Sequence, residues 1–358
     1  MDGLKPGSRL AVGSLPQGEA AEALRFQARF FPEIPAWPQL PKRSRRESMV
    51  RQGLSGIPGM VWGEEGNPIW TLREADTEEA LELLVSENRS GKLGRAAFLE
   101  GEADGFEAFR QAMGGTLGAG AMALKGQCAG PITLGLALRD ESGKPALASK
   151  ARMEILVEYL LLQARWQCAR LLELGKPVVF FLDEPAMNDR LDPQTYALQA
   201  SDWERWYESI LGRLQEEGFL TGIHACGAGS WNWAFKTPME IFHWDAFRDG
   251  AAMADQADAG AAFLAKGGIL AWGLVPTQPF RGSFPEPAEL LTRWIEGARL
   301  LARRGPSPEE IAGRSFFSTS CGLGISPIGL AEQAVRCLDM LATLWRVETE
   351  EGTRPHLF

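Results

Sequence analysis

Three side chains that commonly bind metals stand at two separate points of the chain. His224 and Cys226 form an H-x-C pair within GIHACG (222–227), and Cys321 lies within SCGLG (320–324). One imidazole and two thiolates suit Zn²⁺, which favours tetrahedral sites with nitrogen and sulfur ligands. Three protein ligands leave a fourth position open, which is typical of a catalytic site rather than a structural one. A thiol bound there would be held as a thiolate nucleophile.

A packing role is the alternative for the H-x-C pair. Such a pair is a weak signal alone, and Trp231 and Trp233, which follow it, fit a small buried patch. The metal hypothesis therefore depends on whether Cys321, far along the chain, reaches the same place.

Two acidic residues follow a predicted strand. Asp183-Glu184-Pro185 comes directly after the apolar run VVFFL (178–182). Acids at a strand end suit general acid/base catalysis or the recognition of an amino or hydroxyl group. We predict catalytic roles for Asp183 and Glu184. The alternative is helix capping and a salt bridge with an arginine.

A further carboxylate and imidazole alternate onto one face of another predicted strand. Asp245 follows EIFHW (240–244) and is predicted to be a fourth metal ligand, or else the partner that orients His224. His243 competes with His224 as the imidazole of the metal site, although no H-x-C context supports it.

The elements that must position these residues alternate between strands and helices. Apolar runs rich in β-branched or aromatic residues predict strands, and apolar residues at helical spacing predict helices. The predicted strands are 9–17, 178–182, 220–225, 239–247, 268–274 and 314–320, with an apolar stretch at 119–124. The predicted helices are 155–166, 201–218, 254–266, 287–304 and 328–347.

Repeated strand–helix units imply parallel strands with right-handed crossovers. No Gly-rich dinucleotide fingerprint follows the first strand, which weakens the alternative of an open doubly wound sheet. The length of 358 residues suits an α/β fold of the (β/α)8 TIM barrel class with additions. In such a barrel the carboxyl ends of the strands share one mouth. Ser14, Asp183, His224 and Cys321 are expected to converge there.

The whole chain, residues 1–358, is predicted to form this single barrel domain. Residues 33–75 are rich in Pro, Gly and Trp and are predicted to be a cap-like N-terminal excursion. The basic segment KRSRRESMVR (42–51) lies within it.

Composition excludes several partners. The net charge of −9 argues against non-specific nucleic-acid binding, and no apolar stretch approaches the roughly 18 residues of a membrane span. The N-terminus lacks the apolar core of a signal peptide. The five cysteines are widely spaced, so we expect a cytoplasmic protein with reduced thiols.

Taken together, the strand ends resemble the superfamily of cobalamin-independent methionine synthase and uroporphyrinogen decarboxylase. The similar motifs, in the order of the synthase, are VGSLPQ (12–17), CAGPITL (128–134), FLDEPA (181–186), HACG (224–227) and SCGLG (320–324). The match is closest to single-barrel methionine-synthase-like proteins, whose Pro-rich excursion this chain also resembles.

The resemblance implies a (β/α)8 barrel with zinc bound by His224, Cys226 and Cys321, which activates a thiol for attack on a methyl group. It also implies that Ser14 and Asp183 help to hold the amino-acid substrate. The synthase has a glutamate ligand between its two cysteine motifs, and the nearest candidate here is Asp245.

The length also bears on the methyl donor. The synthase has two barrels, this chain has room for one, and the missing barrel supplies part of the folate-binding apparatus. A methyl-corrinoid protein is therefore the expected donor, with a folate as the alternative.

We therefore expect a zinc-dependent methyltransferase that acts on a small-molecule thiol. The first alternative is a metal-independent lyase of the uroporphyrinogen decarboxylase type, in which Arg43, Arg45 and Arg46 bind a polycarboxylate and the cysteines have no role. The second is a non-enzymatic barrel that binds a corrinoid or a thiol ligand.

Overall fold

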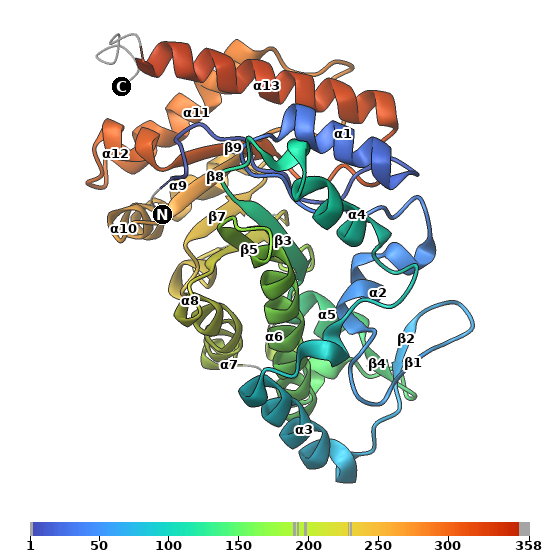
Figure 1. Cartoon of the computed structure of the whole chain (residues 1–358). Helices are drawn as coiled ribbons and strands as arrows, with labels where there is room; N and C mark the ends of the chain where they lie inside the picture. Colours follow the sequence, from blue (N-terminus) through green and yellow to red (C-terminus); the bar gives the residue numbers. More distant parts are fainter. Residues whose placement is uncertain are drawn as a thin grey trace.

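The centre of the molecule is a sheet of six parallel strands with helices around it (Figure 1). The computed structural model describes residues 3–188, 191, 193–196, 199–227, 229 and 231–350. In spatial order the strands are β3 (Leu124–Ala129), β5 (Val178–Asp183), β6 (Leu220–Ala225), β7 (Ile241–Trp244), β8 (Ile269–Val275) and β9 (Ser315–Thr319). Nearly every residue of these strands is buried, as expected for a parallel sheet covered on both faces.

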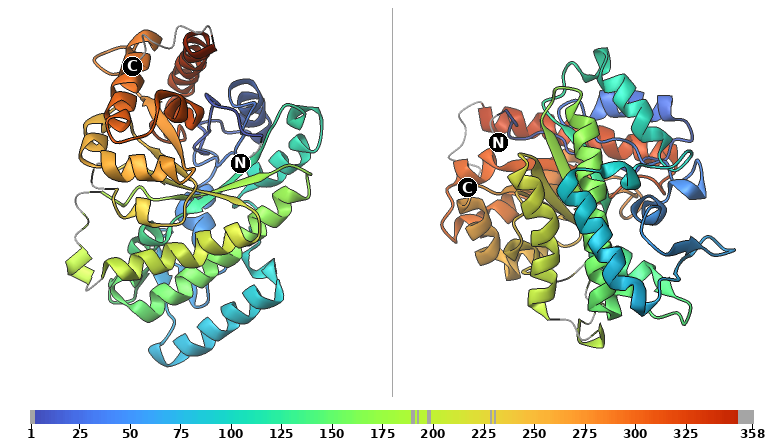
Figure 2. Two further views of the ribbon diagram at one scale, coloured as in Figure 1. Left: turned by 90° about the vertical axis from the view of Figure 1, so that its left-hand side faces the viewer. Right: turned by 60° about the horizontal axis from the view of Figure 1, so that its bottom comes forward.

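Helices cover the outer face of this sheet, as the two views of Figure 2 show. Contacts join α6 to β3 and β5, α8 to β6, α10 and α11 to β8, and α13 to β8 and β9. The helices are α1 (Ala20–Phe30), α2 (Met49–Leu54), α3 (Thr77–Ser90), α4 (Asp104–Met113), α5 (Pro131–Ala137), α6 (Lys150–Leu172), α7 (Ala200–Tyr207), α8 (Arg213–Glu216), α9 (Gly250–Asp255), α10 (Ala257–Ala265), α11 (Pro287–Ala302), α12 (Pro308–Gly313) and α13 (Ile328–Glu350). Within the described ranges, none of them combines the length and the apolar character that crossing a membrane requires.

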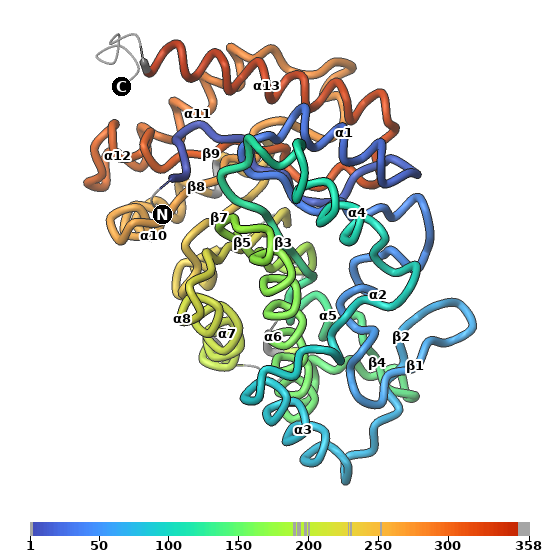
Figure 3. Tube along the Cα trace, viewed as in Figure 1, coloured from blue at the N-terminus to red at the C-terminus, as the bar shows by residue number. Residues whose placement is uncertain are grey.

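Two extended N-terminal segments meet the two edges of the sheet. Single parallel bridges join Arg9 to β9, Leu10 to Ile34, and Ala36 to β3. In Figure 3 the blue N-terminal trace passes beside β9. The α/β fold is therefore barrel-like, with these segments lying between the first and last strands of the sheet.

The predicted excursion 33–75 begins inside this arrangement rather than outside it. Ile34 and Ala36 are fully buried, and the backbone of Lys125 in β3 bonds to that of Pro35 and Trp37. Because this stretch contains several prolines, the sequence did not indicate that its first part is extended and buried. The later part does project: β1 (Met60–Trp62) and β2 (Pro68–Trp70) form a small separate sheet with β4 (Arg139–Asp140).

Most predicted elements are found, with three informative differences. The strand predicted at 9–17 has only isolated bridges, at Arg9, Leu10 and Ser14. The strand predicted at 220–225 is β6 with the same bounds. The helix predicted at 201–218 is α7 and α8 joined by a π-helical stretch, Glu208–Gly212. The strand expected near 119–124 lies instead at Leu124–Ala129, because the buried polar residues Lys125 and Gln127 disguise it in the sequence.

The inner face of the sheet is apolar at one end and polar at the other. The apolar end is a cluster that we call the inner cluster: Leu10, Ile34, Ala123, Val179, Phe181, Ile241, Ile269, Ala271 and Phe316. Beyond it toward the strand C-termini lie buried polar side chains, among them Asp183, His224 and His243. The inner face therefore places its polar groups at the C-terminal ends of the strands, next to the apolar inner cluster.

The long helix α6 provides a matched test of the outer core. Leu160 is fully buried, whereas Leu172, at the end of the same helix, is half exposed. We expect Leu160→Ala to lower the free energy of unfolding by about 2–5 kcal/mol, because it removes packed methyl groups and leaves a cavity. Leu172→Ala should change it by no more than about 0.5 kcal/mol. Urea unfolding measures both, and equal losses would contradict this packing.

Candidate metal centre

The strand register places three of the predicted residues in one row. Asp183 of β5 is the Cα partner of His224 in β6, and His224 is the partner of His243 in β7. Partners in register point to the same face of a sheet. The three side chains therefore share the inner face at the C-terminal end of the strands.

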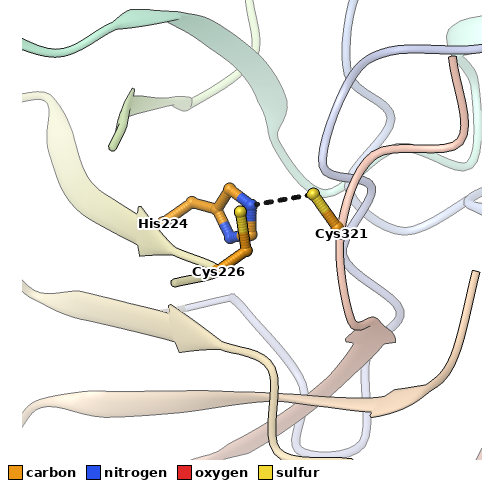
Figure 4. Close-up of side chains that lie close together, drawn as sticks. All are labelled: His224, Cys226 and Cys321. Carbon is orange, nitrogen blue, oxygen red and sulfur yellow. Dashed lines mark hydrogen bonds between the residues drawn. The ribbon is translucent and has the colours of Figure 1, made fainter. Parts of the chain in front are cut away.

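The three predicted sulfur and nitrogen ligands lie together. Ligand atoms of His224, Cys226 and Cys321 all lie within 4.8 Å of one another. The Sγ atom of Cys321 is 3.7 Å from Nε2 of His224. Figure 4 shows Cys321 facing the imidazole from the loop after β9, while His224 and Cys226 come from the end of β6. The long-range approach that the metal hypothesis required is thus present.

The two thiols share a hydrogen bond. The Cys226 thiol bonds to the sulfur of Cys321, which lowers the pKa of Cys321 and, with burial, raises the pKa of Cys226. A metal ion binds cysteine as the thiolate, so binding at these two sulfurs would release their thiol protons.

Asp245, the predicted fourth ligand, is not a member of this group. Its Oδ1 accepts the backbone N–H of Arg248 at 2.9 Å, and the Asp245 carbonyl accepts that of Asp249. Burial raises the pKa of its carboxyl to about 6. The structure thus gives Asp245 a turn-capping contact after β7, and its role as a ligand stays a prediction.

His243 contacts the imidazole of His224 from the neighbouring strand. The Nδ1 atoms of the two rings face each other, and Nε2 of His243 lies 3.1 Å from the carbonyl of Thr319. Both rings are buried. Burial lowers the pKa of His243 to about 3 and holds the pKa of His224 well below its usual value. Both imidazoles are therefore neutral near pH 7.

Asp183 has an unexpected buried partner, Lys125 of β3. Burial raises the pKa of Asp183 to about 7, against the opposing effect of Lys125, and burial lowers the pKa of Lys125 to about 8. The Lys125 ammonium donates to the Val12 carbonyl at 2.7 Å and lies 4.6 Å from the centroid of the Phe181 ring. Sequence analysis missed Lys125. Lys125 and Gln127 are two residues apart in β3 and so share one face of the strand. This pattern could predict the inward position of Lys125 only once the strand was placed correctly.

One carboxylate oxygen of Asp183 lacks a hydrogen-bond partner among the residues that the structure describes. The side chain is nevertheless only 5% exposed. An unpaired buried acceptor costs about 1–3 kcal/mol, so this oxygen is suited to a donor from a bound molecule.

Glu184 points away from this centre and anchors α5. Its carboxylate accepts the backbone N–H groups of Ile132 and Thr133 at 3.0 and 2.9 Å, the Thr133 hydroxyl and the Tyr207 hydroxyl. A carboxylate at a helix N-terminus satisfies free N–H groups and complements the helix dipole. The structure thus gives Glu184 an anchoring contact at the start of α5, and its catalytic role stays a prediction.

Ser14 lies beside the loop that carries Cys321. Its hydroxyl accepts the N–H of Gly324 at 3.4 Å, and its carbonyl accepts that of Leu323 at 3.0 Å. These bonds tie the first N-terminal segment to that loop. A substrate-binding role for Ser14 stays a prediction.

The remaining cysteines lie apart from the centre. All five are free thiols, and Cys128, Cys168 and Cys337 are buried. A separate cavity of about 640 Å³ opens near the N-terminal ends of β3 and β9, lined by residues that include Lys5, Trp345 and Arg346. It holds none of the predicted site residues, and catalytic sites in barrels lie at the opposite, C-terminal ends of the strands.

Comparison with known proteins supports the fold. No protein-family model matches the sequence, and no curated protein matches it. The structure is similar to a B12-independent methionine synthase from a Shewanella species, solved in complex with selenomethionine. The TM-score is 0.56 at 13% sequence identity, and the alignment covers 97% of this chain and 99% of that chain. At this identity the likeness shows a methionine-synthase-like fold.

The anchoring of α5 can be tested by removing one donor to Glu184. We expect Tyr207→Phe to lower the free energy of unfolding by about 1–3 kcal/mol, because it removes a hydrogen bond to a buried carboxylate. Tyr196→Phe, at a half-buried tyrosine outside this network, should cost no more than about 0.5 kcal/mol. Equal effects in chemical denaturation would argue against the anchor.

Proposed function

We propose that this chain is a zinc-dependent methyltransferase that acts on a small-molecule thiol. The observation that supports it is the approach of His224, Cys226 and Cys321 at the C-terminal ends of the sheet. We also propose that the two bridged N-terminal segments complete an eight-stranded barrel, which would put this centre at its mouth.

The donor set suits zinc. Two sulfurs and one imidazole nitrogen are ligands that select Zn²⁺ over hard cations such as Mg²⁺, which prefer oxygen. Three protein ligands leave a position for the substrate sulfur. A bound zinc ion would lower the pKa of that thiol, so that it reacts as a thiolate at neutral pH.

The inner face beside this centre supplies a second recognition element. Within the described residues, one carboxylate oxygen of Asp183 is unpaired. Burial raises the pKa of this carboxyl to about 7, and the Lys125 ammonium opposes that rise. An amino group on the substrate would donate to this oxygen and offset the cost of its burial. We therefore propose an amino-acid thiol as the substrate, with a methyl-corrinoid protein as the donor and a folate as the alternative.

The lyase alternative is less well supported. It needs free cationic side chains for a polycarboxylate. Of its three arginines, Arg43 is already paired with Glu47 at 2.6 Å and with Asp104, while Arg45 and Arg46 are exposed. Buried Arg9 is paired in the same way with Glu33. The convergence of two thiols and an imidazole would also be left without a role.

Metal content tests the proposal directly. We expect about one zinc per chain in wild-type protein prepared without a metal-binding tag, and loss of that zinc in Cys226→Ser and Cys321→Ser. Cys337→Ser is the matched control, because its buried thiol is bonded to the Pro285 carbonyl and lies outside the group. Mass spectrometry of metals, beside circular dichroism to verify folding, gives the readout.

Wild-type protein that stays metal-free after zinc is restored under reducing conditions would overturn the proposal. So would full zinc in both variants of the centre. Asp245→Asn separates the three-ligand and four-ligand versions, since it should keep its zinc if the carboxylate serves only the turn after β7.

Substrate recognition by Asp183 has its own test. We expect Asp183→Asn to weaken the binding of homocysteine to the zinc-loaded protein by about tenfold or more, because a charge-assisted hydrogen bond contributes about 1.5–3 kcal/mol. Binding of 4-mercaptobutyrate, which lacks the amino group, should change little. Titration calorimetry of both thiols measures the difference. Equal losses of affinity for the two thiols would show that Asp183 does not bind the amino group.

A further inference from the structure

Four polar contacts form a closed circuit behind the candidate metal centre. Sγ of Cys321 faces Nε2 of His224, and Nδ1 of His224 faces Nδ1 of His243. Nε2 of His243 faces the Thr319 carbonyl at 3.1 Å, and the Thr319 hydroxyl donates to the Cys321 carbonyl at 2.8 Å. The circuit therefore returns to the residue where it began.

The carbonyl in this circuit decides where each ring keeps its proton. A backbone carbonyl can only accept, so Nε2 of His243 must carry a hydrogen. The neutral His243 ring then has its lone pair on Nδ1. Because that lone pair faces Nδ1 of His224, this second Nδ1 must carry the hydrogen. The lone pair of His224 is left on Nε2, the atom that faces Cys321.

From this circuit we propose that His243 is a positioning residue that fixes the tautomer of His224, so that Nε2 is presented unprotonated to the metal. The inference rests on the proposed function for its purpose, but the tautomer itself exists without metal. Histidine ligands usually donate their second N–H to a carboxylate, a carbonyl or water. Here the acceptor is a second imidazole, that of His243. The tautomer of His243 is in turn fixed by the Thr319 carbonyl.

The surroundings of His243 fit this role better than that of a ligand. Both of its nitrogens already face protein atoms, and neither belongs to the three-residue group. Asp245, the sequence-based candidate for orienting His224, is occupied by the N–H of Arg248. The positioning partner is thus His243, two places earlier in the chain and inside β7.

A glycine on the next strand leaves room for this ring. A Cβ atom at Gly273 of β8 would lie 3.2 Å from Nε2 of His243 and 2.3 Å from the carbonyl of Trp244. A side chain at this position would therefore clash with the backbone of β7 and crowd the His243 ring. Ala271, the register partner of His243, is also small. Together the two residues clear the path from the His243 imidazole to the end of β9.

The tautomer can be read directly by NMR. The chain has only three histidines, so two-bond ¹H–¹⁵N spectra of labelled protein are simple to assign with His243 variants. We expect His224 to be protonated on Nδ1 in metal-free wild-type protein and to keep that proton when zinc is added. His243→Phe, which keeps an aromatic ring but removes the acceptor, should allow the Nε2-protonated form to appear.

Zinc affinity provides the second readout, by competition with a chromophoric chelator at one pH. We expect His243→Phe to weaken zinc binding by about 10–100-fold, the usual effect of losing a partner of a metal ligand. His243→Asn places an acceptor oxygen at the same δ position and should recover most of that loss. Thermal unfolding of both variants verifies that they fold.

The outcomes separate this inference from the proposed function. Nε2 protonation of His224 in the metal-free wild type would overturn the inference, and so would a zinc-dependent shift showing His243 itself as a ligand. Wild-type affinity in His243→Phe would do the same. If the wild type bound no zinc, the proposed function would fail, while the metal-free spectra would still decide the tautomer.

Discussion

The candidate centre depends on the register of three parallel strands. β5, β6 and β7 are aligned so that Asp183, His224 and His243 are neighbours in one row on the inner face. A shift of one residue in any strand would turn its side chain to the helix-covered face. The apolar inner cluster, which fills the other end of the same face, holds this register because a slipped strand would lose its buried contacts.

Burial determines which protonation states the side chains of this row adopt. In a low-dielectric interior, isolated charges cost several kcal/mol each, so the groups found there are neutral or paired. The imidazoles are neutral, one thiol bonds to the other, and Lys125 has a carbonyl, an aromatic face and the nearby Asp183 as partners. Neutral imidazole is the form that binds a metal ion, so burial favours this form of His224. Burial has the opposite effect on the thiols, because it disfavours their thiolates.

Local patterns in the sequence predict most of the strands of the sheet, but not the contacts between them. His224 lies within a strand whose bounds could be predicted, and Cys226 follows that strand. The barrel hypothesis then predicted that Cys321 lies near both. The link from His243 to Thr319 could not be predicted, because it depends on register and on the space beside Gly273. Lys125 was missed since a buried lysine breaks the apolar signature by which strands are recognised.

The neighbouring acids Asp183 and Glu184 differ in their surroundings, although they are adjacent at the end of β5. Successive side chains point to opposite faces. Glu184 turns outward to four donors that fix the start of α5 and tie it to Tyr207. Asp183 turns inward, where one oxygen has no partner within the described residues. Asp183 is also the register partner of His224, which sets the place of that oxygen beside the ligand-bearing strand. A substrate amino group and a substrate sulfur could then be bound at a set separation, which is how a site of this kind would select among thiols.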